Sequence, residues 1–378
     1  MHSIKNRSAT IMKRILFIGS IPPPITGQSL ACEIFLHELR KKYIVHVINI
    51  NKNNLKSGKF ENYRFLAILS LVYKSWKHAR TSDAIYFTIS ESILGNLKDL
   101  FIFLVTWRIL PKSAVHLHGG AGMKRLLANP RSPLRIINKF FLSRIGNVIV
   151  LGNRLKPIYN GVVDYKKIEI VQNFSEKEFS ASSNEIDCKF SNFENLRILY
   201  LSNMIPEKGY IYLKDAVQNI NNILNKKLYL DFAGNFITEE DKINFLNSIS
   251  DDPYVNYHGV VHGEIKRQLL IRSHILALPT FYPYEGQPIS ILEAYAAGCA
   301  VLTTDHSGIF DIFTPTLNGW QVDKASQKSI ESAITYCLAN KAEVKKVGQF
   351  NAASARENFS TERYNNELLN IMENLLRD

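Results

Sequence analysis

The sequence predicts an α/β protein with two domains, each built on a parallel β-sheet that helices cover on both faces. Strand-length apolar runs alternate with helical stretches through both halves of the chain, which is typical of doubly wound sheets. A length of 378 residues is enough for two domains of ordinary size. The apolar content of 46% and the charged content of 21% are those of a globular protein and exclude a disordered chain.

The first half of the chain contains five apolar runs that we expect to form one sheet. Their length and composition are those of strands that are buried on both faces. The runs cover residues 13–19, 44–50, 84–88, 114–118 and 148–151. We assign residues 1–175 to this Rossmann-like N-terminal domain.

A polar stretch rich in Ser, Asn and Glu follows this domain, and we expect residues 176–195 to be a linker. We assign residues 196–358 to a second Rossmann-like domain, with strands at 196–201, 227–234, 255–258, 275–280 and 300–304. The chain ends in residues 359–378, where the spacing of Leu368, Met372 and Leu375 predicts a helix with one apolar face.

Composition argues against several classes of protein. The four cysteines are scattered without a CxxC pair, so we expect neither a disulfide framework nor a zinc site. The longest apolar runs are shorter than the roughly 20 residues that a membrane-spanning helix needs. The polar stretch 1–10 does not resemble a signal peptide. We therefore expect a cytoplasmic protein that at most rests on the membrane surface.

Positive charge is concentrated in the first half of the chain. The formal net charge is +12, and residues 1–167 contain 27 Lys and Arg against 7 Asp and Glu. No acidic residue lies between Asp99 and Asp164, an interval with the basic residues Arg108, Lys112, Lys124, Arg125, Arg131, Arg135, Lys139, Arg144, Arg154 and Lys156. Such a surface would attract anionic lipid at about 1 kcal/mol per basic residue near the headgroups. By charge alone it would attract nucleic acid equally well, and a solvated face without a partner is a third interpretation.

The most informative segment is the stretch 284–298. Glu285 precedes Pro288, which suits the first position of a helix, and Gly298 suits the helix end. Glu293 then lies about a turn and a half inside the helix. Strand-like runs flank the segment, so we expect its loop at the carboxyl end of a sheet, where open α/β folds bind ligands. Two carboxylates beside helix N–H groups suit a ligand with hydroxyls and a phosphate, although two isolated glutamates would simply be solvated.

This segment resembles the E-x7-E signature of the retaining glycosyltransferases of family 4, of the type that builds bacterial surface polysaccharides. The stretches 305–309 and 318–320 fit the same pattern. The resemblance implies the GT-B fold, in which two Rossmann-like α/β domains face each other across a cleft and the last helix crosses back to the first domain. It further implies that Glu285 contacts the transferred sugar and that Glu293 binds the donor ribose. The neighbouring donor-binding residues would be Gly286, Gln287, Pro288 and Ile289.

Two motifs of the first half are similar to motifs of the same family. A proline-rich loop at residues 21–29 contains Gly27, which lets the backbone approach a ligand closely. By resemblance this loop faces the donor diphosphate or the acceptor. His118 ends a strand and opens a glycine loop, and the resemblance implies a catalytic contact with the donor sugar. A turn without a ligand and a core histidine are the simpler interpretations of these residues.

The loop after the first strand of the second domain resembles the phosphate clamp of the family. Lys208 lies in the sequence Pro-Glu-Lys-Gly, and the resemblance implies that it holds the donor diphosphate during catalysis. Asn203 stands where the family has an arginine, which removes a bidentate clamp and leaves a neutral hydrogen-bond donor. By resemblance, the loops that contain Gly234, Asn235 and Val260 approach the nucleobase.

The resemblance implies a retaining glycosyltransferase that moves a sugar from a nucleotide-diphosphate sugar to an acceptor hydroxyl. No carboxylate cluster in the sequence suits a divalent metal, so we expect a reaction without metal or cofactor. We expect the acceptor to be a saccharide or a lipid-linked saccharide at the cytoplasmic face of the inner membrane, and we expect no specific nucleic acid. A GT-B sugar-nucleotide epimerase and a non-catalytic lipid- or nucleic-acid-binding protein are the alternatives.

Overall fold

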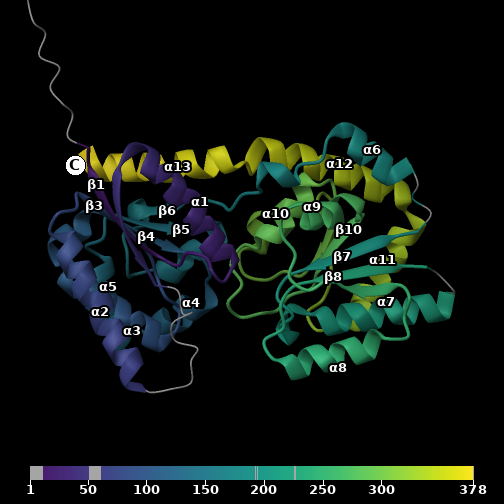
Figure 1. Ribbon diagram of the computed structural model, residues 1–378, viewed down its shortest axis with the longest axis horizontal. Coiled ribbons are helices and arrows are strands. Elements are labelled where there is room, and N and C mark those ends of the chain that lie inside the picture. Colours follow the sequence, from purple (N-terminus) through teal and green to yellow (C-terminus); the bar gives the residue numbers. More distant parts are fainter. Residues whose placement is uncertain (1–11, 51–60, 192, 194, 225–226, 378) are drawn as a thin grey trace, which may run out of the picture.

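The computed structural model describes residues 12–50, 61–191, 193, 195–224 and 227–377. These residues form two α/β halves, each built on a six-stranded sheet. Figure 1 shows the two halves side by side, with the last helices running along both of them. Residues 1–11 and 51–60, which belong to the predicted N-terminal domain, lie outside the described residues.

The N-terminal sheet has the strand order β2-β1-β3-β4-β5-β6, and all neighbouring strands are parallel. β3 and β4 are buried along their whole length, as strands covered on both faces must be. The strands are β1 (Arg14–Gly19), β2 (Ile44–Asn49), β3 (Ala84–Thr88), β4 (Ser113–Leu117), β5 (Asn147–Val150) and β6 (Ile168–Ile170). The sequence does not predict β6, because three residues are too few to show a periodic pattern.

Helices cover both faces of the N-terminal sheet. They are α1 (Gly27–Lys42), α2 (Glu61–Ala79), α3 (Ile93–Val105), α4 (Ala121–Ala128) and α5 (Pro133–Leu142). Phe35 of α1 packs against Tyr86 of β3 with ring centroids 4.9 Å apart, and Phe103 of α3 packs against Phe87 at 5.1 Å. Consecutive residues of a strand point to opposite faces, so α1 and α3 lie on opposite faces of the sheet.

The C-terminal sheet is also parallel, with the order β12-β11-β10-β7-β8-β9. Counted from β7, this is the 3-2-1-4-5-6 order of Rossmann folds, and the strand order reverses between β7 and β10. The strands are β7 (Arg197–Leu201), β8 (Tyr229–Ala233), β9 (Val255–Tyr257), β10 (Ile275–Leu278), β11 (Ala300–Thr303) and β12 (Gly319–Gln321). The three-residue β12 is the second strand that the sequence does not predict.

Among the described residues, six helices belong to the C-terminal half before the chain turns back. They are α6 (Ser183–Ser191), α7 (Tyr210–Leu224), α8 (Glu239–Ile249), α9 (Gly263–Arg272), α10 (Ile289–Ala296) and α11 (Gln327–Ala339). α6 lies inside the stretch 176–195 that we expected to be a linker, and it buries Ile186 and Phe190 in the C-terminal core. These two side chains, four positions apart, form a single apolar stripe on a polar helix, which the composition of the stretch conceals.

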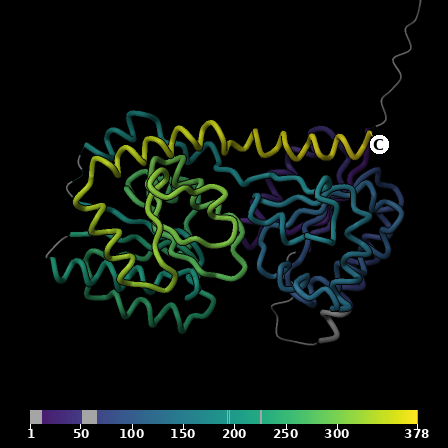
Figure 2. The backbone as a smooth tube through the Cα atoms, turned by 180° about the vertical axis from the view of Figure 1, so that it is seen from behind, coloured from purple at the N-terminus to yellow at the C-terminus, as the bar shows by residue number. Residues whose placement is uncertain are grey.

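The last two helices connect the halves. α12 (Lys341–Asn358) packs on the C-terminal half, and α13 (Thr361–Arg377) crosses to the N-terminal half, as Figures 1 and 2 show from opposite sides. Leu368, Met372 and Leu375 of α13 are buried together with Phe17 of β1 and Tyr86 of β3. Among the described residues, no helix has the length and apolarity that crossing a membrane requires.

The two halves touch at the carboxyl ends of their strands. A Cβ atom on Gly286 would lie 2.1 Å from the carbonyl oxygen of His118, so only glycine allows the loops after β10 and β4 to pack this closely. Arg154 of the N-terminal half forms an ion pair with Asp305, and its backbone N–H donates to Asp311 at 3.2 Å. Open α/β sheets bind ligands at such carboxyl ends.

Candidate functional site

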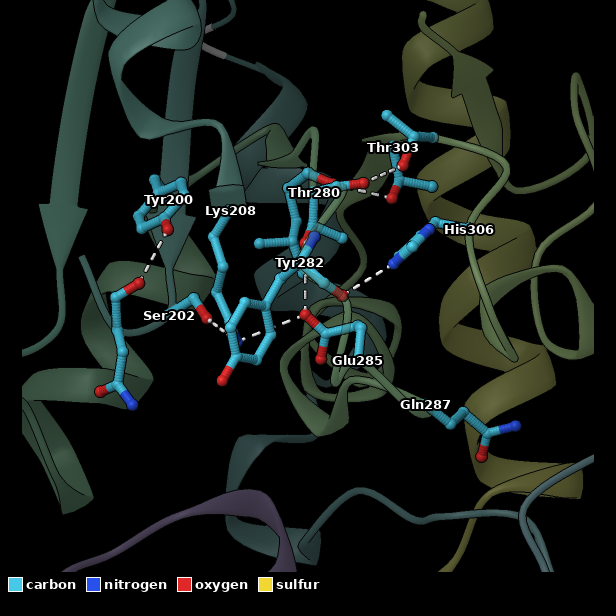
Figure 3. Close-up of polar contacts among 12 residues, drawn as sticks. Tyr200, Ser202, Lys208, Thr280, Tyr282, Glu285, Gln287, Thr303 and His306 are labelled. Carbon is cyan, nitrogen blue, oxygen red and sulfur yellow. Dashed lines mark hydrogen bonds and ion pairs between the residues drawn. The ribbon is translucent and has the colours of Figure 1, made fainter. Parts of the chain in front are cut away.

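Lys208 and Glu285 meet where the strand order of the C-terminal sheet reverses (Figure 3). Lys208 ends a one-turn 3-10 helix after β7, and Glu285 lies in the loop between β10 and α10. Lys208 Nζ lies 3.3 Å from Glu285 Oε2, and the two side chains are only 13% and 10% exposed. Their attraction is therefore screened less than that of a surface pair, although desolvation opposes it. Two of the three predicted catalytic groups thus form one charged pair.

Polar and aromatic neighbours hold both members of this pair. Lys208 Nζ donates a hydrogen bond to Ser202 Oγ at 2.8 Å, and Thr280 Oγ1 donates to Glu285 Oε2 at 3.4 Å. The ring centroid of Tyr282 lies 5.5 Å from Lys208 Nζ, which is within reach of a cation–π interaction. Ser202 and Thr280 could hardly be found from the sequence, because their only signal is that Ser202 directly follows β7 and Thr280 lies two residues after β10.

Hydrogen bonds fix the backbone on the approach to Glu285. The N–H of Glu285 donates to the carbonyl of Tyr282 at 3.0 Å, and His306 Nε2 donates to the same carbonyl at 2.7 Å. The Thr304 hydroxyl donates to the carbonyl of Thr280. A carboxylate on a loop held in this way is already oriented before a ligand binds, which lowers the entropic cost of binding.

The start of α10 offers hydrogen-bond donors beside Glu285. The helix begins at Ile289, one residue later than predicted, because the ψ angle of Pro288 is 121° and therefore extended. Within the described part of the chain, the N–H groups of Gly286 and Gln287 donate to no acceptor. They lie at the positive end of the α10 dipole, an arrangement that suits an anion. Gly298 ends this segment with a left-handed φ of +73°.

The Gln287 side chain connects the two halves. Its Oε1 accepts from the backbone N–H of Asn173 at 2.7 Å, and its Nε2 donates to the carbonyl of Leu151 at 3.1 Å. Asn173 Nδ2 donates in turn to the Gln287 carbonyl at 2.7 Å. The Gln287 side chain is buried and bonded to the N-terminal half. The backbone N–H of Gln287 is therefore the group that can bind a donor substrate.

Glu293, the predicted ribose ligand, is a buried and paired carboxylate. Its Oε1 lies 2.6 Å from Lys266 Nζ of α9, and the Glu293 and Lys266 side chains are 2% and 16% exposed. Lys266 Nζ also lies 4.3 Å from the ring centroid of Phe179. Burial raises the pKa of the Glu176 carboxyl, and the nearby charge of Glu293 adds to this rise. Lys266 carries no sequence signal, because it lies 27 positions from its partner on another helix.

His118 follows β4 and stacks on His116 with ring centroids 4.0 Å apart. His116 Nδ1 lies 2.7 Å from the hydroxyl of Tyr86, and the Nε2 atoms of both histidines are buried without a hydrogen-bond partner among the described residues. Burial lowers the pKa of His118 to about 3, so its imidazole is neutral at physiological pH. A buried nitrogen without a partner is costly unless a ligand or water satisfies it.

The proline-rich loop ends at the start of α1. Thr26 caps this helix, with its Oγ1 accepting from the Ser29 N–H at 3.1 Å and Ser29 Oγ accepting from the Thr26 N–H at 2.8 Å. A Cβ atom on Gly27 would lie 3.8 Å from Ile289 Cδ1. The structure therefore places Gly27 against the side chain of the first residue of α10, although the two segments are far apart in the sequence.

The predicted nucleobase loops form one bonded layer after β7, β8 and β9. The Met204 N–H donates to the Asn235 carbonyl at 2.9 Å, and the Gly234 N–H donates to the carbonyl of Gly259 at 2.8 Å. A Cβ atom on Gly234 would lie 1.8 Å from the Ser202 carbonyl oxygen, so this close packing requires glycine. Exposed residues from all three loops border the layer: Asn203, Asn235 and Val260.

The N-terminus of α4 is occupied by a carboxylate of the protein. Glu91 Oε2 accepts from the N–H groups of Gly122 at 3.0 Å and Met123 at 3.3 Å. Burial raises the pKa of Glu91, and these backbone hydrogen bonds oppose the rise. Of the two helix starts next to His118, α4 is thus satisfied internally and α10 is open to an external anion.

Two Rossmann-like halves whose carboxyl edges meet, with a last helix that crosses back to the first half, define the GT-B fold, which confirms the predicted fold class. The crystal structure of Anabaena Alr3699/HepE in complex with UDP and glucose is similar over 96% of this chain and 100% of that chain, with a TM-score of 0.73 and 16% identity.

Residues 184–354 match the family model of Glycosyl transferases group 1, and Lys208, Glu285 and Glu293 lie inside the matched segment. The uncharacterized glycosyltransferase MJ1607 of Methanocaldococcus jannaschii is 25% identical over 50% of this chain and 46% of its own length. The capsular polysaccharide biosynthesis glycosyltransferase CapH of Staphylococcus aureus is 26% identical over 44% of this chain and 42% of its own length. Each match thus spans less than half of the relative.

Proposed function

We propose that this protein is a retaining glycosyltransferase that moves a sugar from a nucleotide diphosphate to an acceptor hydroxyl. The observation that carries the proposal is the Lys208–Glu285 pair, 3.3 Å apart and mostly shielded from water, beside the free amides at the start of α10. Two comparisons support it, because CapH is named for capsular polysaccharide biosynthesis and the HepE crystal contains UDP and glucose.

The charged pair has a distinct role for each member. A bound donor places its diphosphate at Lys208 and the amides of Gly286 and Gln287, where the negative charge that develops on departure is stabilised. Glu285, relieved of its lysine partner, accepts hydrogen bonds from the sugar hydroxyls and fixes the ring for attack. The bond between the anomeric carbon and the phosphate oxygen breaks, the acceptor oxygen bonds to that carbon on the same face, and the acceptor proton passes to the departing phosphate.

His118 completes the sugar subsite from the N-terminal half. Its neutral imidazole and its unpartnered Nε2 suit a hydrogen bond with a sugar hydroxyl. Glu293 binds the ribose in this proposal, held in place by Lys266. Because Asn203 stands in place of the arginine of the family, the diphosphate depends on Lys208 and the α10 amides, with Asn203 as a neutral hydrogen-bond donor.

We further propose a saccharide or lipid-linked saccharide as the acceptor, at the cytoplasmic face of a bacterial inner membrane. The basic first half of the chain supports this location, because cations attract anionic headgroups. The reaction as proposed requires no metal or cofactor, so a chelator should leave turnover unchanged.

The test is turnover of a panel of nucleotide sugars, beginning with UDP-glucose, measured as acceptor-dependent release of nucleoside diphosphate. Lys208→Met should lower turnover by about 100- to 1,000-fold, the usual loss when one group that stabilises developing charge is removed. Glu285→Gln should lower turnover by about 100-fold, because the sugar is no longer held in position for attack. Glu207→Gln, at an exposed neighbouring position, is the matched control and should retain turnover. Wild-type turnover in either site variant contradicts the proposal, and turnover of the donor without acceptor would indicate an epimerase.

A further inference from the structure

Helix α3 carries apolar side chains on its outer face as well as its inner face. Leu94, Leu97, Phe101 and Leu104 are 79%, 40%, 57% and 58% exposed. Their spacing of three, four and three residues places them in one stripe along the helix. The opposite side of α3 buries Phe103 against the sheet, so the exposed stripe points away from the core.

The two helices beside α3 have the same property. α3 contacts both α2 and α5, and Figure 1 shows the three helices grouped on one side of the N-terminal half. α2 exposes a stripe with the same spacing, and α5 exposes a shorter one. We refer to the combined surface as the apolar face, and it consists of Leu66, Leu69, Tyr73, Trp76, Leu94, Leu97, Phe101, Leu104, Ile136, Ile137 and Phe140. Soluble monomers rarely expose contiguous apolar patches of this kind without a partner.

Cations border the apolar face, and exposed carboxylates are missing from it. Lys74 and Lys77 of α2, Arg80 directly after it and Lys139 of α5 are exposed. From Leu66 to the end of α2 and throughout α3 and α5, the only carboxylate is Asp99, which is fully buried and lies 2.9 Å from Lys98. The charge of this surface is therefore of one sign.

Tryptophan and arginine side chains pair at the border of the apolar face. The Arg80 guanidinium lies 3.8 Å from the ring centroid of Trp76, and that of Arg144 lies 4.0 Å from Trp107. Trp107 also stacks on Phe140, with ring centroids 5.1 Å apart. Tryptophan and basic residues at the edge of an apolar surface are typical of the depth where a membrane meets water.

We infer that the apolar face inserts into the interfacial region of a membrane with anionic lipids, which deepens the proposed function by naming the surface that docks. Charge complementarity selects this partner. A second copy of the chain bound through the same face would place cations against cations, and from Leu66 to the end of α2 and throughout α3 and α5 no exposed carboxylate compensates them. An anionic bilayer supplies apolar chains for the stripes and negative headgroups for the cations.

The sequence-based expectation placed the basic interval between Asp99 and Asp164 at the membrane, and the structure gives some of its cations other partners. Arg154 belongs to the basic interval but pairs with Asp305 and Asp311 at the boundary between the halves. Arg135 is occupied by the carbonyls of Leu127 and Asn160. Several cations that border the apolar face lie outside the basic interval, on α2 or directly after it. Apolar side chains add to the attraction that these cations provide.

The test is flotation of the full chain with vesicles of phosphatidylcholine that contain phosphatidylglycerol. Leu97→Gln combined with Phe101→Gln should lower vesicle partitioning by about 100-fold, since each removes one large side chain from the lipid. The matched control, Ile223→Gln combined with Ile243→Gln, changes side chains that are 71% and 51% exposed on the C-terminal half, and it should bind as wild type. Leu94→Gln, at 79% exposure, replaces the double variant if that variant does not fold.

Two further measurements decide between outcomes. With Trp320→Phe as background, the fluorescence of Trp76 and Trp107 should shift to the blue on anionic vesicles and should not shift in the double variant. Some binding should survive about 1 M NaCl, where the Debye length is roughly 3 Å, because apolar insertion is not screened. Unchanged flotation of the double variant, or binding that salt abolishes completely, overturns the inference. A dimer in sedimentation velocity that the double variant loses, without vesicle binding, would assign the face to a second copy.

Failure of this inference and failure of the proposed function are distinguishable. The double variant should retain wild-type turnover with a water-soluble acceptor, because the apolar face does not include Lys208 or Glu285. Glu285→Gln should bind vesicles as wild type and lose turnover. A protein that docks without any sugar transfer would retain this inference and refute the function.

Discussion

Replacing Lys266 by methionine tests whether Glu293 depends on its partner. The two groups lie 2.6 Å apart, and the Glu293 side chain is only 2% exposed. Removing one partner of a buried pair leaves an uncompensated charge and typically costs about 3–5 kcal/mol. The total free energy of unfolding of an ordinary domain is about 5–15 kcal/mol. We therefore expect Lys266→Met to lower the free energy of unfolding of the C-terminal half by about 3–5 kcal/mol.

The assay is urea unfolding followed by circular dichroism, with the Lys345–Asp187 pair as control. That pair is 3.3 Å apart with side chains 41% and 62% exposed, so Lys345→Met should cost less than about 1 kcal/mol. Lys266→Met combined with Glu293→Gln should recover most of the loss, because the buried charge disappears. Equal, small effects of Lys266→Met and Lys345→Met would refute the reasoning. Loss of stability in the double variant equal to that of Lys266→Met would refute it as well.

Two further predictions concern the boundary between the halves and the buried histidines. Gln287→Ala leaves the Asn173 N–H and the Leu151 carbonyl without partners, which should lower the free energy of unfolding in urea by about 2–4 kcal/mol. Burial lowers the pKa of His118 to about 3 and that of His274 to about 4, so the native state binds fewer protons than the unfolded chain. Stability should therefore fall as pH drops below about 6.5, by about 1.4 kcal/mol per pH unit for each histidine down to its native pKa. Urea unfolding at pH 7 and pH 5 checks this, and equal stability at both values would contradict it.

Features that depend on local pattern could be predicted from the sequence. The strands that carry the loops of Lys208 and Glu285 are apolar runs long enough to recognise, and their alternation with helices gives the parallel order. The Gly298 turn follows from the left-handed geometry that glycine permits. β6 and β12 could not be predicted, because a three-residue strand exists only through its pairing with β5 and β11.

Features that depend on distant contacts could not be predicted. The pairing of Glu293 with Lys266 joins two helices, and the bonds of Gln287 depend on which backbone groups of the other half come near. The exposure of Phe101 was equally hidden, since an apolar residue on a helix is normally expected to face the core. The charges of the first half were visible in the sequence, but their partners were not, since Arg154 pairs with Asp305 of the other half.

The position of α13 has a consequence for the order in which the protein is made. Leu368, Met372 and Leu375 complete the core around Phe17 and Tyr86, yet about 200 residues separate them from the end of the first half. Ribosomes add about 5–20 residues per second, so this face of the nascent N-terminal sheet waits roughly 10–40 s for its last helix. The half that is translated first is thus the last to complete its core. During this waiting time its exposed apolar surface is available to chaperones.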